Sequence, residues 1–234
     1  MSILQELRDN KFLRDIDIYF AKNIAESFEV PEAELLFALI FKATEGGNTC
    51  LDTSNAQSFE FYERYSEHID KVLNHKFINE LMSKKIIAEA PATDAPFIRV
   101  AGNIYMKSFY SDEKSVSDFI SSMASDRPDI DTERLSKLID KYFTEDSMQK
   151  AAALNAALNR LTVISGGPGT GKTSTVFSLT ALLCEMADKK LKIAVCAPTG
   201  KAAARLTETV AEKRKDFSYK NILEQIPEKA LTIH

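Results

Sequence analysis

The sequence predicts a mixed fold, in which a mainly α-helical N-terminal domain with a small β-hairpin precedes the first part of an α/β domain built on a parallel sheet. Three observations predict it. Apolar residues recur at helical spacing over most of residues 1–146, two apolar runs alternate with helical segments after that point, and four of the 8 glycines fall within residues 166–171. With 234 residues, 44% of them hydrophobic, the chain can fill one large core or two small ones.

We place the first domain at residues 1–146. Helical spacing of apolar residues runs from residue 2 to about residue 45, and Pro31 within it is typical of a helix start. Further helices are expected over residues 56–67 and 70–88. No catalytic or metal-binding pattern is recognisable in this helical domain, and its role as a docking domain is implied only by the family resemblance that the second domain carries.

The same domain contains the only predicted hairpin. Residues 97–109 form two apolar runs that are separated by a turn at residues 101–103, and residues 49–51 are expected to be a short extended piece. Apolar residues over 116–123 and 135–143 predict two more helices.

Composition and charge exclude several classes of protein. The sequence has no apolar window of membrane-spanning length and no secretory signal, and its three cysteines show no paired spacing. A cytoplasmic protein without a disulfide framework is therefore expected. The net charge of −4 is uneven, because residues 1–150 carry 27 acidic and 18 basic side chains while residues 151–234 carry 7 and 12. This asymmetry indicates two parts with different partners, although it is also compatible with a role in solubility alone.

The second domain, residues 147–234, follows a strand–loop–helix pattern. Its order predicts a βαβ unit of a parallel sheet, which is truncated within this chain. The expected segments are, in order, a helix over 147–159, a strand over 161–165, a helix over 172–186, a strand over 192–198 and a helix over 200–213.

The glycine cluster carries the clearest chemistry. It satisfies the pattern G-x-x-x-x-G-K-[ST] of a phosphate-binding loop, between an apolar run and an amphipathic helix. Glycine lets backbone N–H groups converge on phosphate oxygens, and the helix dipole favours the same anion. Lys172 is predicted to reach the β- and γ-phosphates, and the Thr173 hydroxyl to bind Mg²⁺. The loop consists of Gly166, Gly167, Pro168, Gly169, Thr170, Gly171, Lys172 and Thr173.

A second segment indicates which activity the bound nucleotide would drive. APTGKAAARL, residues 197–206, leaves a predicted strand through a turn of small residues and enters an alanine-rich helix. It resembles motif Ia of superfamily 1 DNA helicases, in which small residues allow the backbone of single-stranded DNA to approach exposed N–H and hydroxyl groups. The resemblance implies DNA contacts at Pro198, Thr199, Gly200, Lys201 and Ala202.

Both motifs together resemble the RecD family, the alpha subunit of exodeoxyribonuclease V. The segments that carry the resemblance are VISGGPGTGKTS (163–174) and VCAPTGKAAARLTET (195–209), with softer similarity in IYMKSFYSDE (104–113) and LTIH (231–234). The resemblance implies that Gln149 contacts adenine and that Ser174 belongs to the ATP site.

The resemblance also implies an activity and partners. It implies an ATP- and Mg²⁺-dependent 5′→3′ DNA helicase subunit that works with RecB and RecC on double-strand breaks. The N-terminal domain would then contact RecC, and single-stranded DNA would contact the second domain.

The chain departs from this family pattern after the phosphate loop. No acidic residue after Thr173 follows an apolar run that is expected to be a strand, as a Walker B carboxylate would. We therefore expect this chain to bind nucleotide weakly but neither to hydrolyse ATP nor to unwind DNA alone. The alternatives are a stand-alone RecD-like helicase, a nucleotide kinase, and a docking module with a vestigial nucleotide loop.

Overall fold

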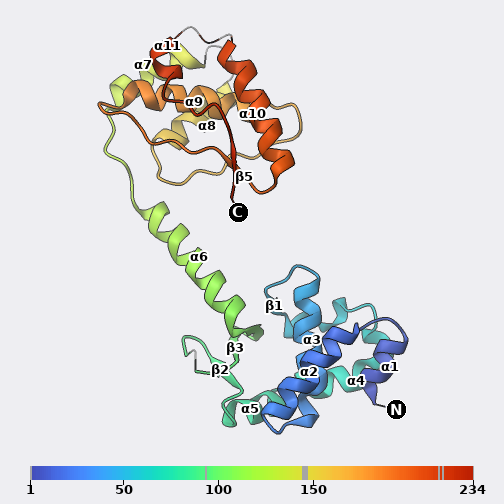
Figure 1. The fold of residues 1–234 in the computed structure, drawn as a ribbon. Coiled ribbons are helices and arrows are strands. Elements are labelled where there is room, and N and C mark those ends of the chain that lie inside the picture. Colours follow the sequence, from blue (N-terminus) through green and yellow to red (C-terminus); the bar gives the residue numbers. More distant parts are fainter. Residues whose placement is uncertain (1, 93, 144–146, 216, 218, 234) are drawn as a thin grey trace. The chain divides into compact units, whose positions relative to one another are not determined.

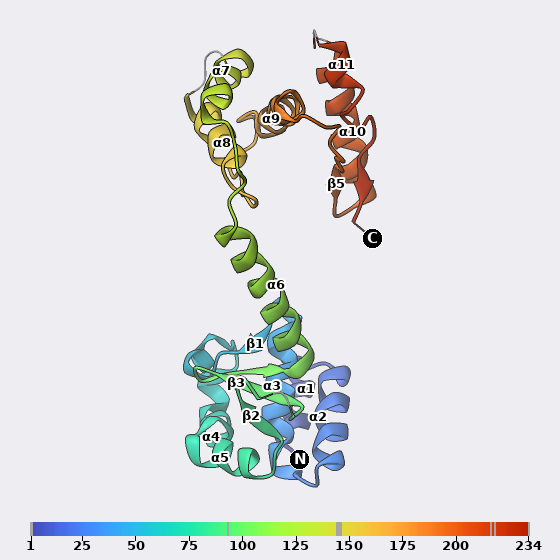
Figure 2. The same ribbon diagram turned by 90° about the vertical axis from the view of Figure 1, so that its left-hand side faces the viewer.

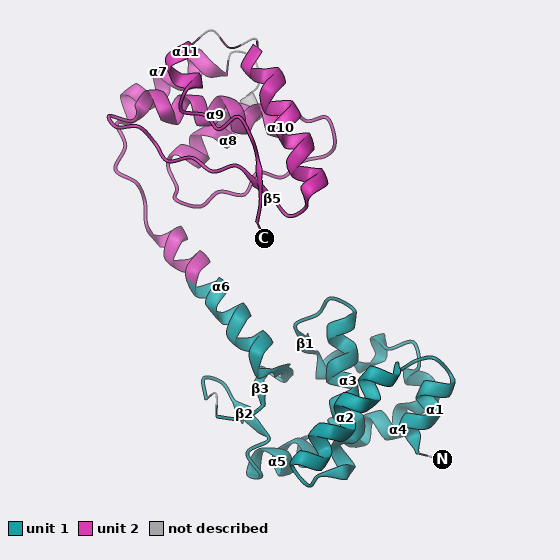
Figure 3. Cartoon of the chain, in the orientation of Figure 1, with its two compact units in different colours: residues 1–118 teal, residues 119–234 magenta. Residues whose placement is uncertain are grey.

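The structure is a computed structural model that describes residues 2–92, 94–143, 147–215, 217 and 219–233. It divides into two compact units, unit 1 (residues 1–118) and unit 2 (residues 119–234), which Figure 3 colours separately. Helix α6 (Lys107–Ser125) contributes residues to both units.

Unit 1 is a helical unit with one small sheet (Figure 1). Its helices and strands are α1 (Ile3–Asp9), α2 (Asp15–Ser27), η1 (Pro31–Ala33), α3 (Glu34–Glu45), β1 (Cys50–Leu51), η2 (Thr53–Ser58), α4 (Tyr62–Leu73), α5 (His75–Ser83), β2 (Ile87–Glu89), β3 (Phe97–Val100) and β4 (Asn103–Met106).

Helix α3 forms the centre of the unit 1 core. Every residue from Leu35 to Ile40 is buried, so this helix is apolar on all sides rather than along one stripe. Phe37 of α3 stacks on Phe97 of β3, with ring centroids 4.9 Å apart and planes at 7°. This contact joins the helical layer to the sheet.

One buried charge closes the start of α2. The Asp17 side chain is fully buried, and it accepts from the Arg14 backbone N–H at 2.7 Å and from the Arg14 guanidinium at 2.9 Å. The two bonds satisfy the carboxylate that the fold withdraws from water. Arg14 also lies 3.3 Å from Glu45, the last residue of α3, and so ties α2 to α3.

The predicted hairpin and extended piece are confirmed. Strands β3 and β4 pair antiparallel, β1 adds to β4, and β2 adds parallel to β3 in the order β1-β4-β3-β2. Ala101 and Gly102 form the turn with φ of 48° and 93°. Two left-handed residues in a two-residue loop match the twist of the strands that they join.

Three boundaries in unit 1 differ from the sequence prediction. The helix expected over 56–67 is not continuous, because η2 ends at Ser58 and α4 begins at Tyr62. The helix expected over 70–88 is interrupted at Asn74, whose side chain accepts from the Phe77 N–H at 2.9 Å and begins α5, and the chain then enters β2. The second hairpin strand ends at Met106 rather than at residue 109, because α6 begins at Lys107.

Unit 2 packs helices around two adjoining apolar clusters. Figure 2 shows α9 between the α7–α8 pair and α10, and contacts join α9 to all three. The elements are α7 (Thr132–Tyr142), α8 (Ser147–Ala157), α9 (Lys172–Met186), β5 (Cys196–Ala197), α10 (Gly200–Lys215), α11 (Lys220–Leu223) and β6 (Leu231–Thr232).

The compact units divide at residue 118, earlier than the change of sequence pattern at residue 146. The reason is the packing of α7, which we had assigned to the first domain. Its apolar residues share a core with α8 and α9, in a cluster of Leu135, Leu138, Ile139, Phe143, Ala153, Ala157, Leu179 and Leu182.

The predicted βαβ pairing is not formed among the described residues. Residues 161–165 join no β-ladder there, and only residues 196–197 of the expected strand 192–198 do so. Strand β5 instead pairs parallel with β6, with Cys196 opposite Leu231. Val163 is accordingly 85% exposed, although the sequence predicted it within a sheet.

The described helices are all too short or too polar to cross a membrane.

A polar network ties α7 to α9. The Glu185 carboxylate accepts from Lys141 at 2.7 Å and from the Tyr142 hydroxyl at 2.5 Å, while Arg134 donates to the Glu185 carbonyl at 2.6 Å. Burial favours the protonated carboxyl, but the hydrogen bonds from Lys141 and Tyr142 outweigh it and hold the pKa of Glu185 below its usual value.

Replacing Glu185 by Gln tests this network. A carboxyl with a lowered pKa stabilises the fold above its unfolded pKa, and this contribution is lost as the pH falls through the folded pKa. We therefore expect E185Q to destabilise unit 2 at pH 7 and to reduce its sensitivity to acid, measured by hydrogen exchange of α9 amides. E133Q, at a side chain that is 81% exposed, is the control and should behave as wild type. An E185Q acid profile equal to that of wild type would contradict the network.

Candidate functional site

The glycine loop reaches α9 through two left-handed residues. Gly169 has φ of 78° and Gly171 has φ of 76°, and Gly171 directly precedes the first helical residue, Lys172. A side chain at these dihedrals is strained, so glycine is required for the loop to enter the helix in this direction. A Cβ at Gly171 would also lie 3.0 Å from Gln149 Nε2. The first turn of α9 therefore starts directly at the end of the loop.

The Lys172 side chain folds back into the loop. Its ammonium donates to the carbonyl oxygens of Gly166 and Gly167, each at 2.6 Å, and the Thr170 hydroxyl donates to the Gly167 carbonyl at 2.9 Å. Among the described residues, no acceptor lies in hydrogen-bonding position for the backbone N–H of Lys172 or Thr173. One short segment thus contains a cation and helix-terminal N–H groups without an acceptor in the described structure, and both kinds of group bind anions such as phosphate.

The hydroxyl residues that follow lie in the first turn of α9. Thr173 and Ser174 are half-buried, and neither hydroxyl has a hydrogen-bond partner within the described parts of the chain. Thr175 is buried and donates to the Gly171 carbonyl at 3.0 Å, so its role is to hold the turn. The described residues contain no cluster of three His, Cys, Asp or Glu side chains that could hold a metal. A Mg²⁺ ion here would therefore depend on Thr173 together with oxygens of the ligand.

A cavity of about 510 Å³ opens beside the loop, between one face of α8 and residues 162–166. This volume lies in the range of small-molecule sites. Gln149 lines it together with Gly166, Thr170 and Lys172. The structure thus brings the predicted adenine contact to the same cavity as three of the predicted loop residues. The other predicted loop residues lie outside its lining: Gly167, Pro168, Gly169, Gly171, Thr173 and Ser174.

Sequence reasoning missed four polar residues of this cavity: Asn155, Thr162, Ser165 and Thr175. The Thr162 hydroxyl is buried without a hydrogen-bond partner in the described structure, which is unusual for a buried polar atom. Asn155 lies six residues after Gln149 on α8, which places it about 9 Å further along the helix and about 120° around it. In the sequence, Thr162 stands out only as a polar residue within the apolar run 161–165.

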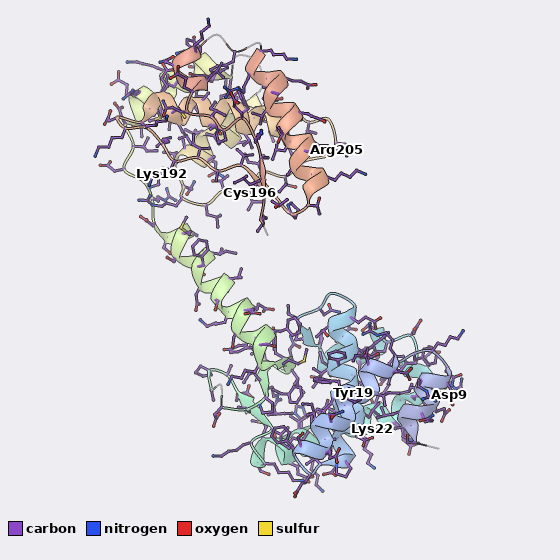
Figure 4. All side chains as sticks on the ribbon, viewed as in Figure 1. Asp9, Tyr19, Lys22, Lys192, Cys196 and Arg205 are labelled. Carbon is purple, nitrogen blue, oxygen red and sulfur yellow. The ribbon has the colours of Figure 1, made fainter. Side chains whose placement is uncertain are left out.

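The second motif forms the turn between β5 and α10. The Thr199 hydroxyl accepts from the Ala202 N–H at 3.2 Å and caps α10. Pro198, Gly200 and Lys201 are exposed, as is Thr199, and Ala202 is half-buried. Figure 4 labels Cys196 on the strand before this turn and Arg205 on the helix after it. None of the five predicted DNA contacts lines the cavity beside the glycine loop.

The turn after β5 lies at the same edge of the sheet as the end of β6. Since β5 and β6 are parallel, with Ala197 opposite Thr232, both strands end on the same side. Open α/β sheets place ligand-binding residues at such carboxyl ends.

Comparison with known proteins finds a matching family for a segment of each unit. Residues 9–105 match the RecBCD enzyme subunit RecD N-terminal domain family, and residues 149–234 match an AAA domain family. The matched segments lie in unit 1 and unit 2 respectively. An AAA domain match agrees with nucleotide use at the glycine loop.

Three curated relatives extend the likeness along the chain. RecBCD enzyme subunit RecD of Mycolicibacterium smegmatis is 34% identical over 90% of this chain and 37% of its own length. The subunit of the same name from Haemophilus influenzae is 29% identical over 100% of this chain and 42% of its own length. The ATP-dependent RecD2 DNA helicase of Deinococcus radiodurans is 29% identical over 75% of this chain and 24% of its own length.

The chain spans about two-fifths of the length of the RecD relatives that it matches. The N-terminal domain match and the run of RecD relatives agree with the phosphate loop and its geometry. The chain is therefore similar to the RecD family over most of its length.

Proposed function

We propose that this chain supplies the nucleotide-binding part of an ATP-dependent 5′→3′ DNA helicase subunit of the RecBCD type, which acts at double-strand breaks in the cytoplasm. The observation that carries the proposal is the glycine loop, which ends in left-handed Gly171 at the start of α9 and holds the Lys172 ammonium against its own carbonyl oxygens. The names of the relatives, RecBCD subunit RecD and ATP-dependent RecD2 DNA helicase, support the same activity.

ATP fits the polar groups around the loop. The Gly166–Ser174 segment would hold the phosphates, with Lys172 exchanging its bonds to two loop carbonyls for the β- and γ-phosphate oxygens. Gln149, against Gly171 and in the same cavity, would contact the base. Thr173 would be a protein ligand of Mg²⁺, which would supply positive charge to neutralise the phosphates.

Single-stranded DNA fits the turn after β5. Its small residues let a nucleic-acid backbone approach, and the exposed Lys201 offers a cation near the α10 N-terminus. Unit 2 as a whole carries 17 basic and 14 acidic residues, so the nucleic acid would meet the basic part of the chain.

Unit 1 fits a protein partner instead. It contains 20 acidic and 13 basic residues, and it holds the segment that matches the RecD N-terminal domain. We assign it to contact with RecC, within an assembly that also contains RecB. The stand-alone RecD2 helicase is a weaker candidate, since its likeness covers 75% of the chain against 90–100% for the RecD relatives named above.

Replacing Lys172 by Gln tests the nucleotide site. We expect K172Q to weaken binding of a fluorescent ATP analogue by at least about tenfold, because it removes the cation at the phosphates, while the melting temperature changes little. K189Q removes an exposed lysine elsewhere in unit 2 and should bind as wild type. In the complete helicase, K172Q should abolish ATP-driven unwinding. Equal nucleotide binding by K172Q and wild type would refute the site.

Replacing Gly171 by Ala tests the backbone requirement. We expect G171A to lose nucleotide binding, because it strains a left-handed residue and places a Cβ 3.0 Å from the Gln149 amide. G47A strains a residue of similar φ, 83°, with no atom within 4 Å of the added Cβ, and it lies in unit 1. A nucleotide titration should separate the two variants. If G47A lost binding equally, the effect would be general instability rather than loop geometry.

Capture by purified RecC tests the assignment of unit 1. We expect RecC to retain the full chain, and to retain K172Q equally, because the contact is assigned to unit 1 rather than to the nucleotide loop. Loss of retention in high salt would agree with an acidic contact surface. Failure of RecC to retain the chain at low salt would favour the stand-alone helicase.

A further inference from the structure

Arg214, near the end of α10, holds the segment that leads into β6. Its guanidinium donates to the carbonyl oxygens of Leu223 and Ile226, each at 2.8 Å, and lies 3.2 Å from the Glu228 carboxylate. Its side chain is only 20% exposed, so these bonds are partly shielded from water. A planar guanidinium that bonds two carbonyls fixes the backbone more firmly than a surface ion pair would.

A second contact from α10 lies closer to the turn. The Thr207 hydroxyl donates to the Ala203 carbonyl at 2.9 Å and accepts from the Ala230 N–H at 3.0 Å. Ala230 is the residue before β6. Two points on one helix therefore hold the same segment at both of its ends.

The segment that Arg214 holds also packs against α9 and α10. Ile222 and Ile226 are buried with Phe177 of α9 and Val210 of α10 in one apolar cluster. In Figures 1 and 2, α10 begins beside β5 and ends beside α11. The C-terminal half of α10 is thus anchored to the segment that leads into β6.

Strand β6 depends on that anchoring for its position. It contains two residues, and the ladder is extended by the Leu231 N–H to the Val195 carbonyl at 2.8 Å and the Ile233 N–H to the Ala197 carbonyl at 3.1 Å. A pairing this short is marginal without support from packed neighbours. Its end lies at the same edge as the turn that contains Thr199.

We propose that Arg214 is a positioning residue for this edge: by clamping residues 223–228 to α10, it fixes β6 beside β5 and so sets the surface that single-stranded DNA meets. The inference rests on the proposed function for the DNA, but the effect of Arg214 on β6 does not. Arg214 itself lies at the opposite end of α10 from the turn and makes no contact with the nucleic acid.

Hydrogen exchange of the full chain tests the clamp without DNA. We expect R214M to speed exchange of the Leu231 and Ile233 amides by at least about tenfold, since it removes three charge-assisted bonds, while the α8 amides exchange as in wild type. K213M and K215M remove the exposed neighbouring charges and should leave both amides protected. R214K, which can still donate to both carbonyls, should restore much of the protection. Unchanged exchange at Leu231 and Ile233 in R214M, or equal acceleration throughout unit 2, would overturn the clamp.

Binding of a fluorescein-labelled oligo(dT) tests its consequence. We expect R214M to bind about tenfold more weakly than wild type, with the same slope of log affinity against log salt, because no phosphate contact is lost. Binding of the ATP analogue should not change. A slope reduced by about one would show that Arg214 contacts phosphate directly, and would overturn a positioning role. If wild type does not bind oligo(dT), the DNA part of the proposed function fails, while the exchange experiment still decides the clamp.

Discussion

The left-handed backbone at Gly169 and Gly171 is the constraint on which the candidate site depends. It lets the chain turn directly from the loop into α9, so Lys172 and the N–H groups of the first helical turn that lack an acceptor in the described part of the chain belong to the same short segment. In the proposed function, a full positive charge and the positive partial charge of the helix end both act on the phosphates. The cavity lined by Gln149 is also lined by Gly166, Thr170 and Lys172, so this segment would set both the proposed anion site and the approach of a nucleoside.

Each unit is stabilised by its own core, and each joins its helices through partly buried charges. In unit 1, α3 and the buried Asp17 organise helices around the sheet. In unit 2, α9 is held by α7 through Glu185 and by α10 through the apolar cluster around Phe177. The helix that begins at the glycine loop is therefore fixed along its length, whereas strands β5 and β6 are short, and apolar side chains such as Val163 and Leu231 are exposed.

The sequence predicted the helical N-terminal part, the hairpin and the placement of the glycine loop before a helix, because those features depend on local periodicity and on glycine. It did not predict that α7 packs with α8 and α9, since apolar spacing identifies a buried face but not the partner that covers it. The predicted pairing of 161–165 with 192–198 was wrong for the described residues, because strand order is set by distant contacts. Thr162 and Arg214 were missed for a related reason: burial and long-range bonds determine their roles.

The central claim is that the loop from Gly166 to Ser174 binds the phosphates of a nucleotide. Amide NMR of the full chain with ATP and Mg²⁺ tests it most directly, because the Lys172 and Thr173 N–H groups are the expected donors. The account predicts large shifts at these amides and at the Gln149 side chain, reduced when adenosine replaces ATP. Saturable shifts confined to other parts of unit 2, or no shift at the loop, would contradict it.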